Sequence, residues 1–166
     1  MRNCTIIVFA ILFFGEINAQ EVCPCCTVPY RQFDFWLGQW SVYDTTGQLA
    51  GHNTIQKIEG NCIISESWKG VKGSSGRSYS YFDRRDSTWN QTWVDSGGGS
   101  LILKGQGGDG QIILKGPLKN GPKGKYYDQI TWQLQEDSTV TQIWKIYDEG
   151  GNVNKTLFYG LYRKEK

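Results

Sequence analysis

The chain has 166 residues and a formal net charge of +2, with 18 Lys and Arg against 16 Asp and Glu. A field this weak gives no reason to expect binding to nucleic acid or to an anionic membrane. The 21 glycines, the 14% aromatic content and the scarcity of alanine favour strands and exclude collagen, coiled coils, helical bundles and helical membrane channels.

The first 19 residues have the order of a secretory signal peptide. Arg2 supplies a positive charge, Ile6 to Phe14 form an apolar run, and Ala19 is a small residue suited to cleavage. The apolar run is too short to cross a bilayer. We therefore predict a signal peptide over 1–19, a cysteine-rich segment over 20–32 and one folded domain over 33–166, in a secreted or periplasmic protein without a membrane span.

Four cysteines follow this leader: Cys23, Cys25, Cys26 and Cys62. Export makes disulfides the expected state, and a bond between adjacent cysteines is strained. We therefore expect Cys62 to pair with one of the other three, which the sequence does not single out. The alternative is a redox or metal site at the C-x-x-C spacing of Cys23 and Cys26. The only histidine, His52, is favoured as an ordinary polar residue over a metal or haem ligand, and no metal or other cofactor is expected.

Between Phe35 and Arg163 the sequence consists of short alternating runs separated by turn residues. A helical turn is expected at Tyr30–Phe35 and a long loop at Gly116–Lys125. Because there is no room for crossover helices, the strands predict an all-β fold, a single antiparallel meander closed into a lipocalin-like β-barrel of about ten strands. The predicted strands are Trp36–Asp44, Leu49–Ile58, Cys62–Trp68, Arg77–Asp83, Thr88–Asp95, Ser100–Lys104, Gln111–Lys115, Tyr126–Leu134, Val140–Tyr147 and Thr156–Arg163.

The strand period of two predicts which side chains face the interior of the barrel. On three successive strands one face combines aromatic rings with a few polar groups, as small-molecule cavities do. The alternative is a solid barrel filled by these rings. The residues predicted to bind a ligand are Trp68, Tyr79, Tyr81, Trp89 and Trp93 as walls, with Glu66, Arg77 and Gln91 as orienting groups.

Glu66 is the most informative of these residues, because a carboxylate between Ile64 and Trp68 must be paired if it is buried. Arg77 on the next predicted strand is its expected partner. A structural ion pair is favoured over a catalytic acid, and no catalytic residue is assigned. Phosphate-binding and dinucleotide-binding motifs are missing from the sequence.

The most distinctive stretch runs from Phe33 to Trp40 and reads F-D-F-W-L-G-Q-W. It resembles the opening of an uncharacterised family of secreted, mostly bacterial, lipocalin-like (calycin-type) barrel proteins with the pattern F-D-F-W-x-G-x-W. The resemblance implies structural roles for Trp36, Gly38, Trp40 and Arg163, with Arg163 packing over Trp40 as the matching arginine does in lipocalins. The related haem-binding barrels of the nitrobindin type use a late histidine, which this chain lacks. Further matching segments are Gly60-Asn61-Cys62, Glu66-Ser67-Trp68, Tyr81-Phe82-Asp83, Trp89 to Asp95 and Tyr162-Arg163.

These observations predict a binding protein that holds a small apolar or amphipathic molecule in a barrel cavity and catalyses no reaction. One alternative is a cofactor-free barrel enzyme that uses Glu66 as a general acid or base, which requires Glu66 to be buried beside a pocket with a raised pKa. The other is a protein-interaction module that uses an exposed strand edge or the loop Gly116–Lys125. The sequence does not indicate an oligomeric state.

Overall fold

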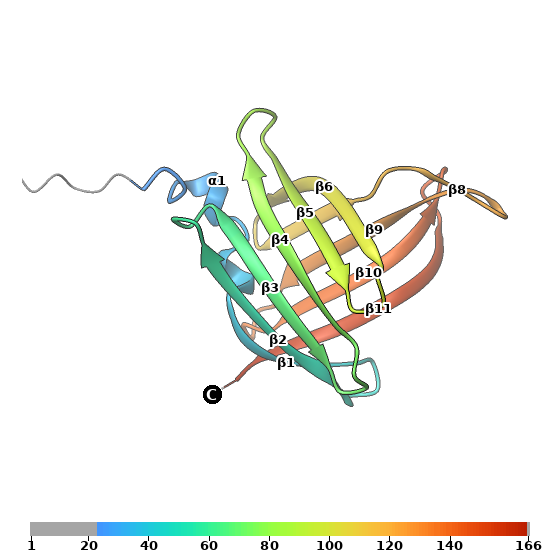
Figure 1. The fold of residues 1–166 in the computed structure, drawn as a ribbon, viewed down its shortest axis with the longest axis horizontal. Coiled ribbons are helices and arrows are strands. Elements are labelled where there is room, and N and C mark those ends of the chain that lie inside the picture. The colour runs from blue at the N-terminus through green and yellow to red at the C-terminus, as the bar shows by residue number, and fades with distance from the viewer. Residues whose placement is uncertain (1–22, 166) are drawn as a thin grey trace, which may run out of the picture.

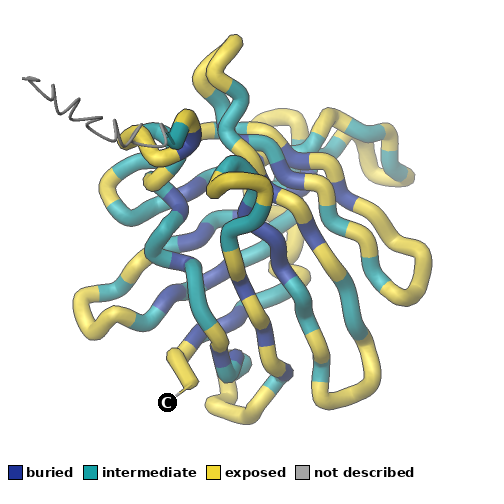
Figure 2. Tube along the Cα trace, turned by 60° about the vertical axis from the view of Figure 1, so that its left-hand side comes forward, coloured by how far each residue is buried: buried dark blue, intermediate teal, exposed yellow. Residues whose placement is uncertain are grey.

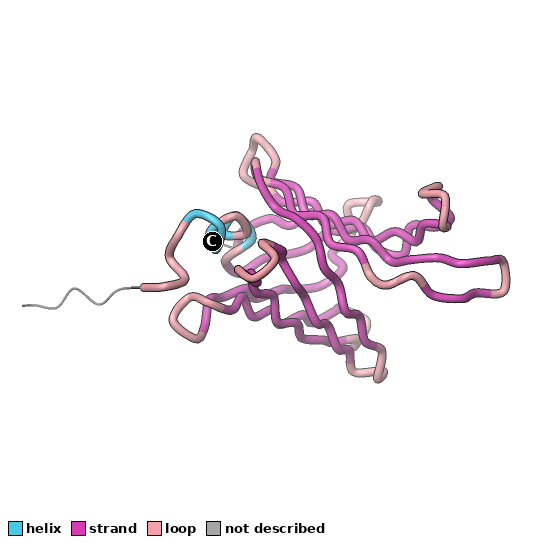
Figure 3. Tube along the Cα trace, turned by 90° about the horizontal axis from the view of Figure 1, so that it is seen from above, coloured by secondary structure: helices cyan, strands magenta, loops and turns pink. Residues whose placement is uncertain are grey.

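The computed structural model describes residues 23–165, so the leader predicted over 1–19 lies outside the described part (Figure 1). Two short helical segments come first, the helix α1 (Val28–Arg31) and the 3-10 helix η1 (Asp34–Trp36). The remainder consists of strands and turns, as Figure 3 shows. Within residues 23–165, no helix has both the length and the apolar character needed to cross a membrane.

Eleven strands follow the two helical segments, and the fold is all-β, as predicted. Ten of them form one closed antiparallel barrel, and the short strand β8, which lies in the predicted loop, pairs only with β9. The strands are β1 (Gly38–Tyr43), β2 (Leu49–Ile58), β3 (Ile63–Gly70), β4 (Ser75–Asp83), β5 (Thr88–Asp95), β6 (Ser100–Gly108), β7 (Gln111–Lys115), β8 (Lys119–Gly121), β9 (Gly124–Leu134), β10 (Val140–Asp148) and β11 (Val153–Lys164).

The barrel closes where the first strand pairs with the last. Trp40 lies opposite Lys164, and Val42 lies opposite Tyr162, in the antiparallel pair of β1 and β11. Closure gives every barrel strand a neighbour on both sides, which removes the open edges along which sheets aggregate. Successive residues alternate between the interior and the solvent, and Figure 2 shows this as alternating buried and exposed positions along the strands.

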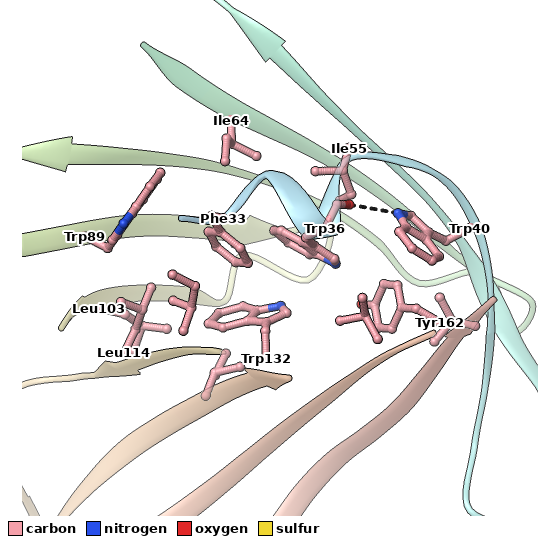
Figure 4. Packing of buried hydrophobic residues seen from close by; sticks show 14 of the residues in the cluster. Phe33, Trp36, Trp40, Ile55, Ile64, Trp89, Leu103, Leu114, Trp132 and Tyr162 are labelled. Carbon is pink, nitrogen blue, oxygen red and sulfur yellow. Dashed lines mark hydrogen bonds between the residues drawn. The ribbon is translucent and has the colours of Figure 1, made fainter. Parts of the chain in front are cut away.

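One end of the barrel is filled, and we call it the closed end. It carries the turns at 59–62 and 84–87 and receives the segment that contains α1 and η1. Phe33 and Trp36 of this segment are fully buried, and Phe33 stacks on Trp36 with ring centroids 4.9 Å apart. Trp132 packs against both rings, and the indole nitrogen of Trp40 donates a hydrogen bond of 2.8 Å to the carbonyl oxygen of Trp36 (Figure 4). The N-terminal segment thus forms a plug inside the barrel.

Covalent and ionic contacts fix the plug to the barrel wall. Cys25 is bonded to Cys62 beside the turn between β2 and β3, which confirms the predicted disulfide from Cys62 to the N-terminal cluster. Cys23 is bonded to Cys26, so the C-x-x-C pair is a second disulfide. The Nζ atom of Lys57 on β2 lies 2.6 Å from a carboxylate oxygen of Asp34 in η1.

A lysine takes the position over Trp40 that the resemblance assigned to Arg163. The Lys164 ammonium group lies 5.4 Å from the centre of the Trp40 ring, whereas the Arg163 guanidinium group lies 5.1 Å from the centre of the Tyr43 ring. The predicted contact of Arg163 with Trp40 is therefore wrong. The register explains the difference, because Trp40 lies opposite Lys164, and Arg163 points to the other face of the sheet.

Gly38, the glycine of the same motif, has a φ of +136°, a conformation that favours glycine. A Cβ atom there would lie 3.5 Å from the side chain of Lys164 and 3.7 Å from the Trp40 indole. Together with the buried Trp36 and Trp40, these contacts support the predicted structural role of the motif at the closed end.

Candidate functional site

The opposite end of the barrel, which we call the open end, contains a cavity of about 480 Å³. This end carries the turns at 71–74, 96–99 and 149–152. The volume lies within the range of pockets that bind small molecules. The cavity is lined by Glu66, Trp68, Ser74, Ser75, Gln91, Trp93, Asp95, Ser96, Gly97, Leu101, Ile130, Gln142, Trp144, Leu157, Phe158 and Tyr162.

Glycines on neighbouring strands position two of the aromatic walls. A Cβ atom added to Gly76 would lie 2.1 Å from the Trp93 ring, and one added to Gly51 would lie 2.6 Å from the Trp68 ring. Each indole therefore occupies space that the side chain of any residue other than glycine at position 51 or 76 would fill. Both rings therefore lie close against the neighbouring strands and border the cavity.

A third part of the wall comes from β10 and β11. Trp144 donates its indole N–H to a carboxylate oxygen of Asp128 at 2.9 Å, and Asp128 is paired with Lys119 at 2.8 Å. The register between β10 and β11 shifts by one residue beside Trp144, so that Leu157 has no directly opposite partner. This bulge brings Leu157 and its neighbour Phe158 to the cavity together, because a bulge redirects the side chains around it.

The floor of the cavity is a connected set of polar side chains in the middle of the barrel. Ser78 donates a hydrogen bond of 2.6 Å to one Glu66 carboxylate oxygen, and Asn53 donates one of 2.7 Å to the other. Gln91 donates to Ser78 at 3.3 Å and to Ser80 at 3.0 Å.

The set continues on the other side of Glu66. Asn53 also donates to the hydroxyl oxygen of Tyr162 at 3.3 Å, and the Tyr162 hydroxyl donates to the side-chain oxygen of Gln142. This polar floor, formed by Asn53, Glu66, Ser78, Ser80, Gln91, Gln142 and Tyr162, separates the cavity from the aromatic plug.

Burial perturbs the two titratable groups of the polar floor. Glu66 is only 4% exposed, and loss of hydration raises its pKa from 4.5 to about 7, although the hydrogen bonds from Ser78 and Asn53 act in the opposite direction. Burial, and secondly the charge of Glu66, raises the pKa of Tyr162 well above its ordinary value. Glu66 therefore gains and loses its proton near neutral pH without a cationic partner in its hydrogen-bond set.

The structure brings together four of the eight predicted ligand-binding residues. Glu66 and Gln91 lie in the polar floor, and Trp68 and Trp93 form walls, as the strand period predicted. Trp89 also points inward, but it lies at the closed end, where its ring contacts Phe33 and its N–H donates to Gln32 at 3.0 Å.

The predicted inward face of β4 is wrong. Tyr79 is 50% exposed and Tyr81 is 43% exposed, and Arg77 also lies on the outer surface. The register decides this, because Glu66 lies opposite Ser78, and residues directly opposite one another share a face. Arg77 is therefore not the partner of Glu66. Small serines point inward from β4 in place of the tyrosines, and this leaves room for the cavity.

Three cavity residues were not predicted from the sequence: Gln142 and Trp144 on β10 and Tyr162 on β11. The same period of two places Val140, Gln142 and Trp144 on one face of β10, but inward faces were predicted for only three strands. Asn53 was also missed, although it lies in strict alternation with the buried residues Gly51 and Ile55 on β2. Neither the bulge at Leu157 nor the inward serines have a comparable signal in the sequence.

His52 lies on the outer surface of the barrel. Its Nδ1 atom lies 2.6 Å from a carboxylate oxygen of Glu165 and 3.4 Å from the Ser41 hydroxyl. Across residues 23–165, no group of three or more His, Cys, Asp or Glu side chains is arranged to hold a metal ion. His52 is thus a surface residue that helps to attach the C-terminal strand.

Comparison with protein-family models and with curated proteins finds no match to this chain. The resemblance to lipocalin-like secreted proteins therefore rests on the motif from Phe33 to Trp40 and the accompanying short segments.

Proposed function

We propose that the protein is an extracytoplasmic binding protein that holds a small apolar or amphipathic molecule in the cavity at the open end of its barrel, without catalysing a reaction. The observation that carries this proposal is the cavity of about 480 Å³, which has aromatic walls on three sides and a polar floor. Pockets for small molecules are mostly apolar and have a few polar groups that fix the orientation of the ligand. Trp68, Trp93 and Trp144 supply the apolar walls, while Glu66 and Gln91 supply orienting groups.

Two further features support the location outside the cytoplasm. The two disulfides are typical of proteins that fold in an oxidising compartment. The sequence over 1–19 has the features of a leader that directs export.

The decisive experiment has two parts. Native mass spectrometry of the protein purified from its own host is expected to show a bound small molecule that organic extraction removes. Extracted protein is then titrated by calorimetry with that molecule, beside the variants Leu157→Trp and Val153→Trp. Both residues are exposed apolar positions on β11, but only Leu157 lines the cavity.

We expect Leu157→Trp to block the cavity and weaken binding at least about ten-fold, since the new ring occupies the ligand volume. Val153→Trp is expected to bind as the unmodified protein does. Equal binding by all three proteins contradicts the proposal, because the ligand would then lie elsewhere.

A second candidate is a cofactor-free enzyme in which Glu66 acts as a general acid or base. One observation favours it: Glu66 lines the cavity, and its pKa of about 7 suits proton transfer at neutral pH. Under this reading the extracted molecule is converted when it is returned to the protein, and Glu66→Gln abolishes the conversion. Recovery of the unchanged molecule after prolonged incubation favours the binding protein.

A further inference from the structure

The charged side chains that line the cavity are of one sign. The ionisable side chains that line it are Glu66 and Asp95 as acids, together with the Tyr162 phenol, and within the described residues no lysine, arginine or histidine is among them. Lys119 lies behind Trp144, but its ammonium group is paired with Asp128 at 2.8 Å and offers no free charge. A fatty acid or another organic anion would therefore face Glu66 without a counterion, at a high electrostatic cost.

The hydrogen bonds of the polar floor leave mainly acceptors for a ligand. Gln91 uses its amide nitrogen on Ser78 and Ser80, so that its carbonyl oxygen, which accepts no hydrogen bond within residues 23–165, is free. Each Glu66 carboxylate oxygen accepts one hydrogen bond and retains a further lone pair. Gln142 adds an amide N–H group, because its oxygen is taken by Tyr162. A ligand head group that fits Glu66 and Gln91 therefore carries several N–H or O–H hydrogens that it can donate in hydrogen bonds.

The walls suit a cation as well as an apolar body. Trp68, Trp93 and Trp144 present ring faces and edges to the same volume, and Phe158 packs against Trp68 with ring centroids 5.9 Å apart. Tryptophan is the aromatic residue that attracts cations most strongly. An ammonium group entering the cavity thus exchanges water for aromatic rings and a carboxylate.

We propose that the cavity selects an amphipathic amine, whose ammonium group binds Glu66 and Gln91 on the polar floor and whose apolar body lies between the tryptophan walls. The inference rests on the function proposed above and specifies its ligand class. It also gives a role to an otherwise costly feature, because Glu66 is a buried carboxyl that accepts hydrogen bonds from Asn53 and Ser78 but has no cation beside it among residues 23–165. The amine supplies the missing charge.

The test uses three ligands of the same shape: naphthylethylamine, naphthylethanol and naphthylacetate. We expect the amine to bind at least about ten-fold more tightly than the alcohol at pH 8, since a hydrogen bond to a charged group exceeds a neutral one by that order. The acetate is expected to bind most weakly. Calorimetry measures all three dissociation constants with the intact protein.

The matched variants are Glu66→Gln and Glu136→Gln. Glu136 is an exposed acid in the turn between β9 and β10, at the closed end of the barrel, and it does not line the cavity. Glu66→Gln is expected to abolish the preference for the amine over the alcohol, whereas Glu136→Gln preserves it. Circular dichroism and thermal unfolding confirm that each variant is folded.

The pH dependence of the preference provides a second readout. Glu66 faces Asn53, Ser78 and Tyr162 on three strands, and of these only Tyr162 titrates, at a pKa far above neutrality. Deprotonation of Glu66 near pH 7 therefore strengthens amine binding about ten-fold between pH 6 and pH 8 in the unmodified protein. Asp95, the other acid that lines the cavity, is present in the unmodified protein and in Glu66→Gln. Any pH dependence that is lost in Glu66→Gln is therefore due to Glu66.

The outcomes separate the two proposals. An amine preference that depends on Glu66 supports the inference. If the alcohol or the acetate binds as tightly as the amine and Leu157→Trp blocks it, the amine inference is overturned and the binding cavity stands. If none of the three ligands binds and no molecule co-purifies with the protein, both proposals are overturned.

Discussion

The chain has seven tryptophans, and the two ends of the barrel use them differently. Four lie at the closed end, Trp36 in the N-terminal plug and the others on the barrel strands, and the Phe33 ring contacts Trp36, Trp89 and Trp132. Three line the open end, where Gly51 and Gly76 hold Trp68 and Trp93 against the wall. Aromatic content alone therefore does not decide whether a barrel is filled or hollow. The neighbour of each ring decides it: a large side chain such as Phe33 fills the interior, whereas a glycine lets the ring lie against the wall.

The largest effect expected from this comparison is on stability. Trp132→Ala at the closed end is expected to lower the free energy of unfolding by about 4 kcal/mol, because the ring is fully buried and its removal leaves a cavity among packed neighbours. Trp93→Ala at the open end is expected to cost only about 1 kcal/mol, because that ring already borders empty space. Urea unfolding of both variants measures the difference. Similar losses would contradict the distinction between the two ends.

The disulfide between Cys25 and Cys62 lies at the closed end, and neither residue lines the cavity. Replacing both cysteines by serine is expected to lower the free energy of unfolding by about 3 kcal/mol, because the bond closes a long loop in the unfolded chain. Ligand affinity should stay within about two-fold, because the bond lies outside the cavity. Unfolding curves and calorimetry measure the two quantities.

The second disulfide is the control for this experiment. Cys23 and Cys26 are only three positions apart, so their replacement by serine is expected to cost about 2 kcal/mol or less. A larger loss of unfolding free energy from this pair than from Cys25 and Cys62 would show that the bond between Cys23 and Cys26 contributes more to stability than the bond to the barrel.

Glu66 lies between the two ends, and its contribution to stability depends on pH. The folded protein keeps the Glu66 proton up to a pKa of about 7, while the unfolded chain releases it near 4.5. Stability therefore falls as the pH rises through this interval, by roughly 3 kcal/mol from this group. Glu66→Gln removes the effect. The difference in unfolding free energy between the two proteins, measured from pH 4 to pH 8, is expected to change by that amount, and a constant difference would contradict the raised pKa.

The smallest effect is expected on the outside of the barrel. Tyr79→Ser and Tyr81→Ser should each change the free energy of unfolding by no more than about 0.5 kcal/mol, since both side chains are exposed. Ligand affinity should not change. A loss of binding in Tyr79→Ser, measured beside Trp93→Ala, would show that the tyrosines take part in ligand recognition after all.

Much of the fold follows from local patterns in the sequence. Turn residues such as Gly60-Asn61 and Gly150-Gly151 mark where strands end, and alternation identifies the strands between them. Ten of the eleven strands lie close to their predicted ranges for this reason. The strand β8 escaped prediction because its three residues, Lys119 to Gly121, lie among Gly, Pro and Lys and pair only with β9.

The cavity was less predictable because it depends on register. Alternation on β4 defines two faces, and either the tyrosines or the serines could point inward. The face with Tyr79 and Tyr81 was predicted to point inward because it combines aromatic rings with a polar group, as small-molecule cavities do. Pairing of Glu66 with Ser78 reverses that choice, and such pairing is a tertiary property that no single strand reveals.

The division of the tryptophans has an optical consequence. Trp36, Trp40, Trp89 and Trp132 lie in a dry, fixed surrounding, so their fluorescence should be insensitive to a dissolved quencher such as iodide. Trp68, Trp93 and Trp144 are only partly buried around the cavity, so their emission should respond both to iodide and to an occupant. The barrel thus contains its own reference signal beside its own reporter, and occupancy can be read without attaching a label.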